Sequence, residues 1–207
     1  MRVTVVVRRR ARPGEGAHLI AAAVHLLEAR LTQATPLSVA RLFQSLSTPD
    51  DVLFVSVWDT RAAYWASLQD NGAEQQLDAL CVGEPGRCFF RQLALEEDAE
   101  RPVVVVDCAI LQSPPADAEA LLSALLHAGQ PLTEIAPGFT LYYLGQDEGD
   151  PTRLILLRGW ESLGALEDFR LQVAPRFEAE WFTHSATVER FMGRSRATVE
   201  GPAHHVL

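Results

Sequence analysis

The chain contains one sequence pattern twice, and this repeat limits the possible fold more than any other feature. In the first copy, an apolar run at 53–58 ends on Trp58 and is followed by an acidic and a hydroxyl residue. The run at 154–160, which ends on Trp160, is followed by the same two residue types. A helical pattern begins directly after each copy. Because the spacing is roughly a hundred residues, the repeat indicates a duplicated domain and not a solenoid of short units.

Apolar periodicity predicts nearly the same order of elements in both copies. In the first copy it predicts strands at 3–7, 37–46, 52–58 and 87–95, and helices at 16–31, 60–68 and 73–80. In the second copy it predicts strands at 103–111, 135–144, 153–160 and 187–192, with helices at 116–128 and 162–182, the latter broken before Pro175. The order β-α-β-β-α-β is that of a ferredoxin-like unit.

Each predicted unit has one sheet with its helices on a single face, so the other sheet face needs a cover. Two such sheets facing one another would supply it. The sequence therefore predicts an α+β protein in which two tandem ferredoxin-like units pack sheet to sheet as an intramolecular α/β barrel. The expected boundaries are 1–96 for the first unit, 97–102 for a charged linker, 103–200 for the second unit and 201–207 for a flexible tail.

Composition excludes several classes of protein. The formal net charge of −9 argues against a nucleic-acid partner or an anionic membrane surface. The chain has no lysine, which excludes a lysine Schiff base and a P-loop lysine. Its three cysteines lack CxxC spacing, and no HExxH motif is present, so no metal site is expected. The N-terminal residues form a strand pattern and no signal peptide, and no apolar run approaches the ~18 residues of a membrane span, so a cytoplasmic protein is expected.

The stretch from Trp58 to Tyr64 resembles the motif of a known family. A strand that ends in Trp, followed by an acid, a hydroxyl residue and an aromatic six positions after the Trp, is similar to the antibiotic biosynthesis monooxygenase family of dimeric α/β barrels. In the second copy, Leu166 stands in place of the tyrosine. The resemblance implies a pocket in each unit between the sheet and its helices. It also implies a pseudo-dimer within one chain, with a further homodimer left open.

The resemblance implies a monooxygenase of secondary metabolism. The expected substrate is a small aromatic, polyketide-type phenol or quinone, oxidised with molecular oxygen. The expected cofactor is either none or a reduced flavin (FADH2 or FMNH2), and haem is not expected, although relatives with this fold degrade haem. Two alternatives stay open: a non-redox polyketide cyclase using the same pocket, and a non-catalytic ligand-binding or assembly protein. Oxygen consumption would separate the first alternative from an oxygenase, since fold alone does not define activity.

Three residues are the predicted catalytic groups. Tyr64 lies one and a half to two turns into the helix that begins beside the strand end, so it could approach the same pocket as Trp58. A phenol can hydrogen-bond a substrate oxygen or move a proton, and an indole N–H can hold a carbonyl or a superoxide-like species. His25 neighbours the apolar stripe of its helix and could act as a pocket base. Each of the three could instead be structural, with the two aromatics as core residues and the histidine partly buried.

The predicted substrate-binding residues come from both copies. An arginine in a pocket could stabilise a phenolate or enolate because it stays protonated and presents a planar fork. Strand patterns contain three such arginines, Arg41, Arg91 and Arg158. The last two join the predicted set, which aromatic side chains complete: Phe54, Trp65, Arg91, Tyr142, Arg158 and Trp160. The unequal copies suggest that one pocket is active and the other altered.

Overall fold

The computed structural model describes residues 2–32, 36–69 and 72–200. The first repeat contains β1 (Val3–Arg10), α1 (Gly16–Thr32), β2 (Leu37–Ser45), β3 (Asp51–Trp58), α2 (Arg61–Gln69), α3 (Gly72–Ala79) and β4 (Gly86–Glu97). The second contains β5 (Val105–Gln112), α4 (Ala118–Ile135), β6 (Phe139–Asp147), β7 (Arg153–Trp160), α5 (Leu163–Gln172), α6 (Ala174–Thr183) and β8 (Thr187–Glu200). None of the helices in these ranges is long and apolar enough to cross a membrane.

The two repeats have the same spacing of elements. From β1 and β5 to α3 and α6, each element of the second repeat begins 102 residues after its counterpart, as at Val3 and Val105 or at Gly16 and Ala118. The strand register is also the same in both repeats, because Val3 lies opposite Trp58 and Val105 lies opposite Trp160. The predicted tandem duplication is therefore confirmed. Each residue up to α3 can be compared with a counterpart 102 positions later.

Antiparallel pairing gives the sheets β1-β3-β2 and β5-β7-β6. The fourth strand of each repeat is long and contributes to both compact units. Of the described residues, unit 1 contains those within 2–89 and 193–200, and unit 2 contains 90–192. In unit 1 the end of β8 pairs with β2, and in unit 2 most of β4 pairs with β6. The hydrogen-bonded order β1-β3-β2-β8-β5-β7-β6-β4 is closed, which confirms the predicted class of two ferredoxin-like repeats with barrel topology.

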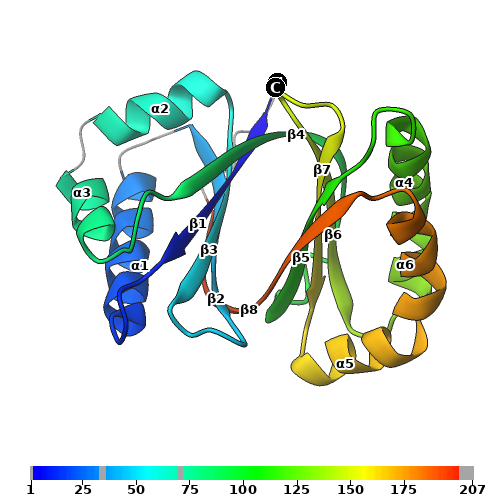
Figure 1. Cartoon of the computed structure of the whole chain (residues 1–207). Coiled ribbons are helices and arrows are strands. Elements are labelled where there is room, and N and C mark those ends of the chain that lie inside the picture. The colour runs from blue at the N-terminus through cyan, green and yellow to red at the C-terminus, as the bar shows by residue number, and fades with distance from the viewer. Residues whose placement is uncertain (1, 33–35, 70–71, 201–207) are drawn as a thin grey trace, which may run out of the picture. The chain divides into compact units, whose positions relative to one another are not determined.

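One face of each sheet is covered by the helices of its own repeat, α1 to α3 in unit 1 and α4 to α6 in unit 2 (Figure 1). The core of unit 1 includes Leu19 from α1, Leu42 from β2 and Leu77 from α3, all essentially inaccessible to solvent. Unit 2 buries Leu121 and Leu125 from α4 in the same way. Apolar burial of this kind is what fixes the helices on the sheet.

The structure corrects the predicted ends of α4, β4 and β8 and the predicted start of β6. The helix α4 continues through Pro131 to Ile135, so Ile135 is helical and the strand β6 begins only at Phe139. Leu132 and Ala136 extend the buried stripe beyond the proline, and this burial outweighs the loss of one backbone N–H. The strands β4 and β8 extend to Glu97 and to Glu200, past their predicted ends, because each pairs with a second sheet. The predicted tail and the break at 70–71 lie outside the described residues.

Candidate functional site

In unit 1 the structure brings the predicted aromatic residues together. Thr60 begins the helix α2, since its Oγ1 accepts a hydrogen bond from the backbone N–H of Ala63 at 3.1 Å. This start places Tyr64 edge-on to Trp58, with ring centroids 5.6 Å apart. Trp65 and Phe89 pack on the other sides of the Tyr64 ring, at 5.3 and 5.6 Å. The four rings form a continuous cluster from the buried end of β3 to the surface.

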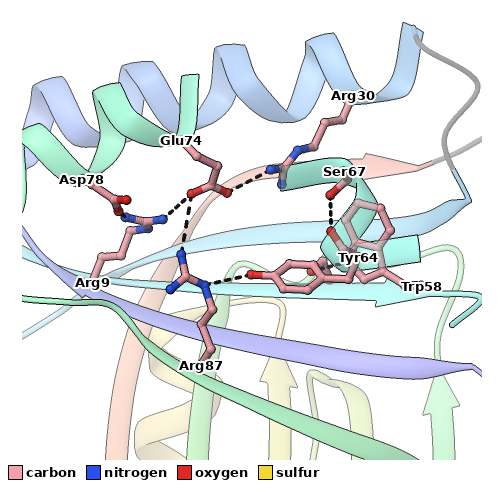
Figure 2. Close-up of polar contacts among 9 residues, drawn as sticks. Arg9, Arg30, Trp58, Tyr64, Ser67, Glu74, Asp78 and Arg87 are labelled. Atoms are coloured by element: carbon pink, nitrogen blue, oxygen red, sulfur yellow. Dashed lines mark hydrogen bonds and ion pairs between the residues drawn. The ribbon is translucent and has the colours of Figure 1, made fainter. Parts of the chain in front are cut away.

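Arg87 is the main polar partner of Tyr64. Its Nε–H donates a hydrogen bond to the Tyr64 Oη at 3.1 Å (Figure 2). Burial raises the pKa of Tyr64 above the ordinary value of 10.0, and the hydrogen bond and charge of Arg87 offset this only in part. Tyr64 is therefore a neutral phenol at physiological pH. Because its oxygen already accepts from Arg87, its own O–H can donate to a ligand oxygen.

A carboxylate at the centre of the site connects four elements. Glu74 of α3 binds Arg9 of β1 at 2.5 Å and Arg30 of α1 at 2.9 Å, and it lies 4.0 Å from Arg87 of β4 (Figure 2). Asp78 provides a second acid by pairing with Arg9. Three guanidinium groups thus face two carboxylates.

Trp58 has a different environment from the one predicted. Its indole N–H donates to the Ser56 Oγ at 2.9 Å, in the buried layer between β3 and the helices. The guanidinium of Arg30 lies 5.9 Å from the ring centroid. Since the indole donor is occupied by Ser56, Trp58 is better placed to support the Tyr64 ring than to hold a substrate carbonyl.

Unit 2 has an arginine at the position equivalent to Ser56. Arg158 is 1% exposed, and its Nη2 donates to Asp107 and to Glu178, each at 2.6 Å. Arg190 donates to the same oxygen of Glu178 at 2.6 Å. Burial raises the pKa of Glu178, but the guanidiniums of Arg158 and Arg190 lower it by more than burial raises it. The net pKa therefore lies below the ordinary value of 4.5. The polar centres of the two units are therefore built from different residues.

Aromatic rings surround Arg158. The centroids of Trp160, Phe169 and Trp181 lie 5.9, 5.0 and 5.3 Å from its guanidinium carbon. The buried Nε and Nη1 of Arg158 and Nε1 of Trp160 have no hydrogen-bond partner within 2–32, 36–69 and 72–200. Buried donors are normally satisfied by protein or ordered water. This centre therefore has donor capacity that the described residues do not use.

The other predicted residues are less central. His25 is exposed on α1, so the expected partial burial is wrong and the residue does not join the Trp58 cluster. Arg91 is exposed on β4, where it donates to Gln146 at 2.7 Å. Phe54 is half-buried on β3, with the guanidinium of Arg9 5.9 Å from its ring. The catalytic role of His25 and the substrate-binding roles of Arg91 and Phe54 stay predictions.

Tyr142 is fully buried, and its hydroxyl donates to the backbone carbonyl of Leu125. Burial raises its pKa well above 10.0. This hydroxyl is used to anchor β6 to α4. It is opposite Arg158 in the strand register, so two of the predicted second-copy residues are neighbours.

Sequence reasoning missed the charged residues of the unit 1 site, Arg30, Glu74 and Arg87. Each sits in an otherwise ordinary helix or strand pattern, and charged residues in such patterns are usually solvent-exposed. The signal that could have identified Arg87 is its place at the start of a strand whose alternation continues to the buried Phe89. The acidic partner of Arg87 is Glu74 of α3, and the pattern of the strand does not encode the position of that helix.

These features define a class of protein: a tandem pair of ferredoxin-like units with a polar site between sheet and helices in each. The sequence profile described as antibiotic biosynthesis monooxygenase matches residues 2–75 and 108–174. The chain belongs to this family. No curated protein sequence matches it.

Solved structures share the fold over nearly the whole chain. A candidate monooxygenase from Fusobacterium nucleatum subsp. nucleatum has a TM-score of 0.78 at 10% identity, covering 96% of this chain and 94% of that one. A candidate monooxygenase from Lactobacillus acidophilus NCFM has a TM-score of 0.76 at 9% identity, covering 96% of both chains. An anthrone oxidase-like protein has a TM-score of 0.72 at 13% identity, covering 96% and 93%. At these identities the likeness shows a common fold.

Proposed function

We propose that the protein is a monooxygenase that oxidises an aromatic phenol with molecular oxygen at the Tyr64–Arg87 site of unit 1. Family membership supports an oxygenase, and similarity to an anthrone oxidase-like protein supports a fused-ring substrate. The observation that carries the assignment to unit 1 is the 3.1 Å hydrogen bond from Arg87 to a buried, neutral Tyr64. The second repeat has Leu166 at the equivalent position and cannot form this pair.

In this proposal the site stabilises the electron-rich anion of the substrate. The O–H of Tyr64 donates to the substrate oxygen, and the nearby guanidiniums of Arg87 and Arg30 favour its negative charge. The phenolate then reacts with oxygen: one oxygen atom enters the ring carbon, the other leaves as water, and the ring loses two hydrogens. The substrate supplies all four electrons, so no external reductant is needed.

Reduced flavin is the alternative, and when bound it would supply two of the electrons. The donors at Tyr64 and Arg87 are matched to a single oxyanion, so we favour the route without a cofactor. The site is covered, since Tyr64 is only 3% exposed. Trp65 is 41% exposed and packs 5.6 Å from Phe89. Substrate access would displace Trp65 from this contact.

Oxygen uptake with 1,8-dihydroxyanthrone as probe tests the proposal. We expect uptake without added flavin, and about a hundredfold lower kcat/KM for Tyr64→Phe, the usual effect of removing one donor to a developing oxyanion. The matched control is Tyr142→Phe, which removes a buried tyrosine hydroxyl in unit 2. Uptake that requires reduced flavin would support the flavin route. Ring closure without oxygen uptake would indicate a cyclase, and binding without turnover a non-catalytic protein.

A further inference from the structure

Unit 2 contains a pocket on the helical side, between α4 and α6, that the proposed oxygenase site does not use. Its volume is about 380 Å³. Small side chains of α4 form one wall, and larger side chains from α4, from α6 and from the residue after α6 complete the pocket. The lining residues are Ala120, Ser123, Ala124, His127, Ala128, Trp181 and His184. This volume is near the lower end of the range for small-molecule sites, about 300 to 1,000 Å³, so it suits one or two fused rings.

The aromatic wall of the pocket is held in place from inside the unit. Trp181 is 3% exposed and belongs to the core of unit 2. The guanidinium of Arg158 lies 5.3 Å from its ring centroid, and Glu178 on the same helix pairs with that guanidinium at 2.6 Å. A ring fixed by such contacts loses little conformational entropy when a ligand binds. Trp181 is therefore a fixed floor of the pocket, and a ligand meets only the small part of its indole that is exposed.

Two histidines line this pocket, and one of them has a defined hydrogen-bond acceptor. The His127 Nδ1 lies 2.7 Å from the carbonyl oxygen of Ser123, so this nitrogen must carry the proton and donate it. In the neutral ring, Nε2 then has a free lone pair. The His184 Nδ1 lies 3.8 Å from the Asp117 carboxylate, which is beyond hydrogen-bond distance and does not fix its tautomer. A ligand hydroxyl can donate to the Nε2 of His127.

We propose that the α4/α6 pocket binds a hydroxylated aromatic molecule of one or two fused rings. The ring packs on the alanine wall over the exposed part of Trp181, and its hydroxyl donates to the Nε2 of His127. Within the described ranges no group of three metal-ligating side chains occurs, so a hydroxyl matches these imidazoles better than a metal ion does. The proposal does not rest on the oxygenase function of unit 1.

The repeat provides matched controls for a binding test. The residues 102 positions before His127 and Ala124 are His25 and Ala22, on the equivalent helix α1. His25 and His127 are both exposed, and Ala22 and Ala124 are both half-buried. Substitutions at these two pairs therefore change similar helix surfaces, and only one member of each pair lines the α4/α6 pocket.

The experiment measures binding of 2-naphthol and of 2-methoxynaphthalene, which has no hydroxyl proton, by isothermal titration calorimetry of the whole chain. We expect His127→Gln to raise the Kd for 2-naphthol about fivefold, the effect of one hydrogen bond, and to leave 2-methoxynaphthalene unchanged. Ala124→Phe, which fills the pocket, should abolish this binding, and His25→Gln and Ala22→Phe should not alter it. Thermal melting confirms that each variant is folded.

Two results would overturn the proposal. One is wild-type affinity for 2-naphthol in the Ala124→Phe variant. The other is equal affinity of the wild-type protein for 2-naphthol and 2-methoxynaphthalene. Loss of binding in Tyr64→Phe with full binding in Ala124→Phe would place the probe in unit 1, which contradicts this inference and leaves the proposed oxygenase intact. If Ala124→Phe loses binding and the wild type takes up no oxygen, the pocket proposal is supported and the proposed oxygenase function is contradicted.

Discussion

The ion pairs of Arg158 lead to a quantitative prediction about stability. Its guanidinium is 1% exposed and contacts the carboxylates of Asp107 and Glu178, each at 2.6 Å. In an Arg158→Met variant the apolar stem is kept and the charge is lost. Among the described residues, Asp107 would then keep Arg190 at 3.5 Å as its ion-pair partner, and Glu178 would keep Arg190 at 2.6 Å. Two buried carboxylates would share one partly exposed guanidinium.

Removing one member of a buried ion pair typically destabilises a protein by about 3 to 5 kcal/mol, because the remaining charge is buried without compensation. We expect about 4 kcal/mol for Arg158→Met near neutral pH, since both carboxylates contact Arg158 closely. For a chain of this length such a loss lowers the melting temperature by about 8 to 16 °C.

The effect should also depend on pH, and its sign follows from Glu178. In the wild type its folded pKa lies below 4.5, so its contribution to stability is present above the unfolded pKa and is lost as the pH falls through the folded pKa. Without Arg158, the raising effect of burial is opposed only by Arg190. The folded pKa rises, and protonation then relieves the buried charge. The stability difference between wild type and variant should therefore shrink on acidification.

The assay is denaturant unfolding followed by tryptophan fluorescence, at about pH 7 and about pH 4.5. The matched control is Arg153→Met, which breaks a partly exposed pair with Asp147 at 3.5 Å and should cost about 1 kcal/mol or less. A loss below about 1 kcal/mol for Arg158→Met would refute the reasoning, because the ion pairs would then be energetically equivalent to surface pairs. A difference that stays constant between the two pH values would refute the electrostatic explanation.

Three further predictions concern local features. Gly159→Ala should destabilise the protein by about 1 to 3 kcal/mol in denaturant unfolding, because its Cβ would lie 2.8 Å from the Val103 Cγ1. Asp51→Asn should weaken the dependence of the unfolding midpoint on acidic pH. The hydrogen bond from Arg10 lowers the pKa of Asp51, so its contribution is lost as the pH falls through that value. Thr60→Ala should lower stability by about 1 kcal/mol in thermal melts, since the cap of α2 is removed.

The two units show how one backbone can support two different polar centres. Apolar residues fix the strands and helices in both, and the 102-residue spacing is kept from β1 through α3. Ser56 and Tyr64 of unit 1 correspond to Arg158 and Leu166 of unit 2. In unit 1 the phenol of Tyr64 is present, and the indole N–H of Trp58 donates to Ser56. In unit 2 leucine replaces that tyrosine, and aromatic rings surround the guanidinium of Arg158. This divergence is consistent with different ligands for the two units.

The sequence by itself determined the duplication, the order of the elements and most of their bounds. These follow from local information: the period of apolar residues, the turn residues, and a hydroxyl residue that begins a helix after each Trp. The strand bounds of β7 were predicted at 153–160 and are found at Arg153–Trp160. The contact between Trp58 and Tyr64 was also accessible, because a helix start beside a strand end limits the separation of the two rings.

Only the tertiary structure decided the polar partners. Tyr64 meets Arg87, 23 residues later, and Arg158 meets Asp107, 51 residues earlier, and no local pattern encodes either pair. An arginine in a strand pattern is compatible with solvent or with a buried carboxylate, and the choice depends on which helix lies above it. The same holds for the long strands β4 and β8, whose continuation depends on a partner strand. Apolar periodicity acts within an element, whereas charge pairing acts between elements, so only the first can be derived from the sequence.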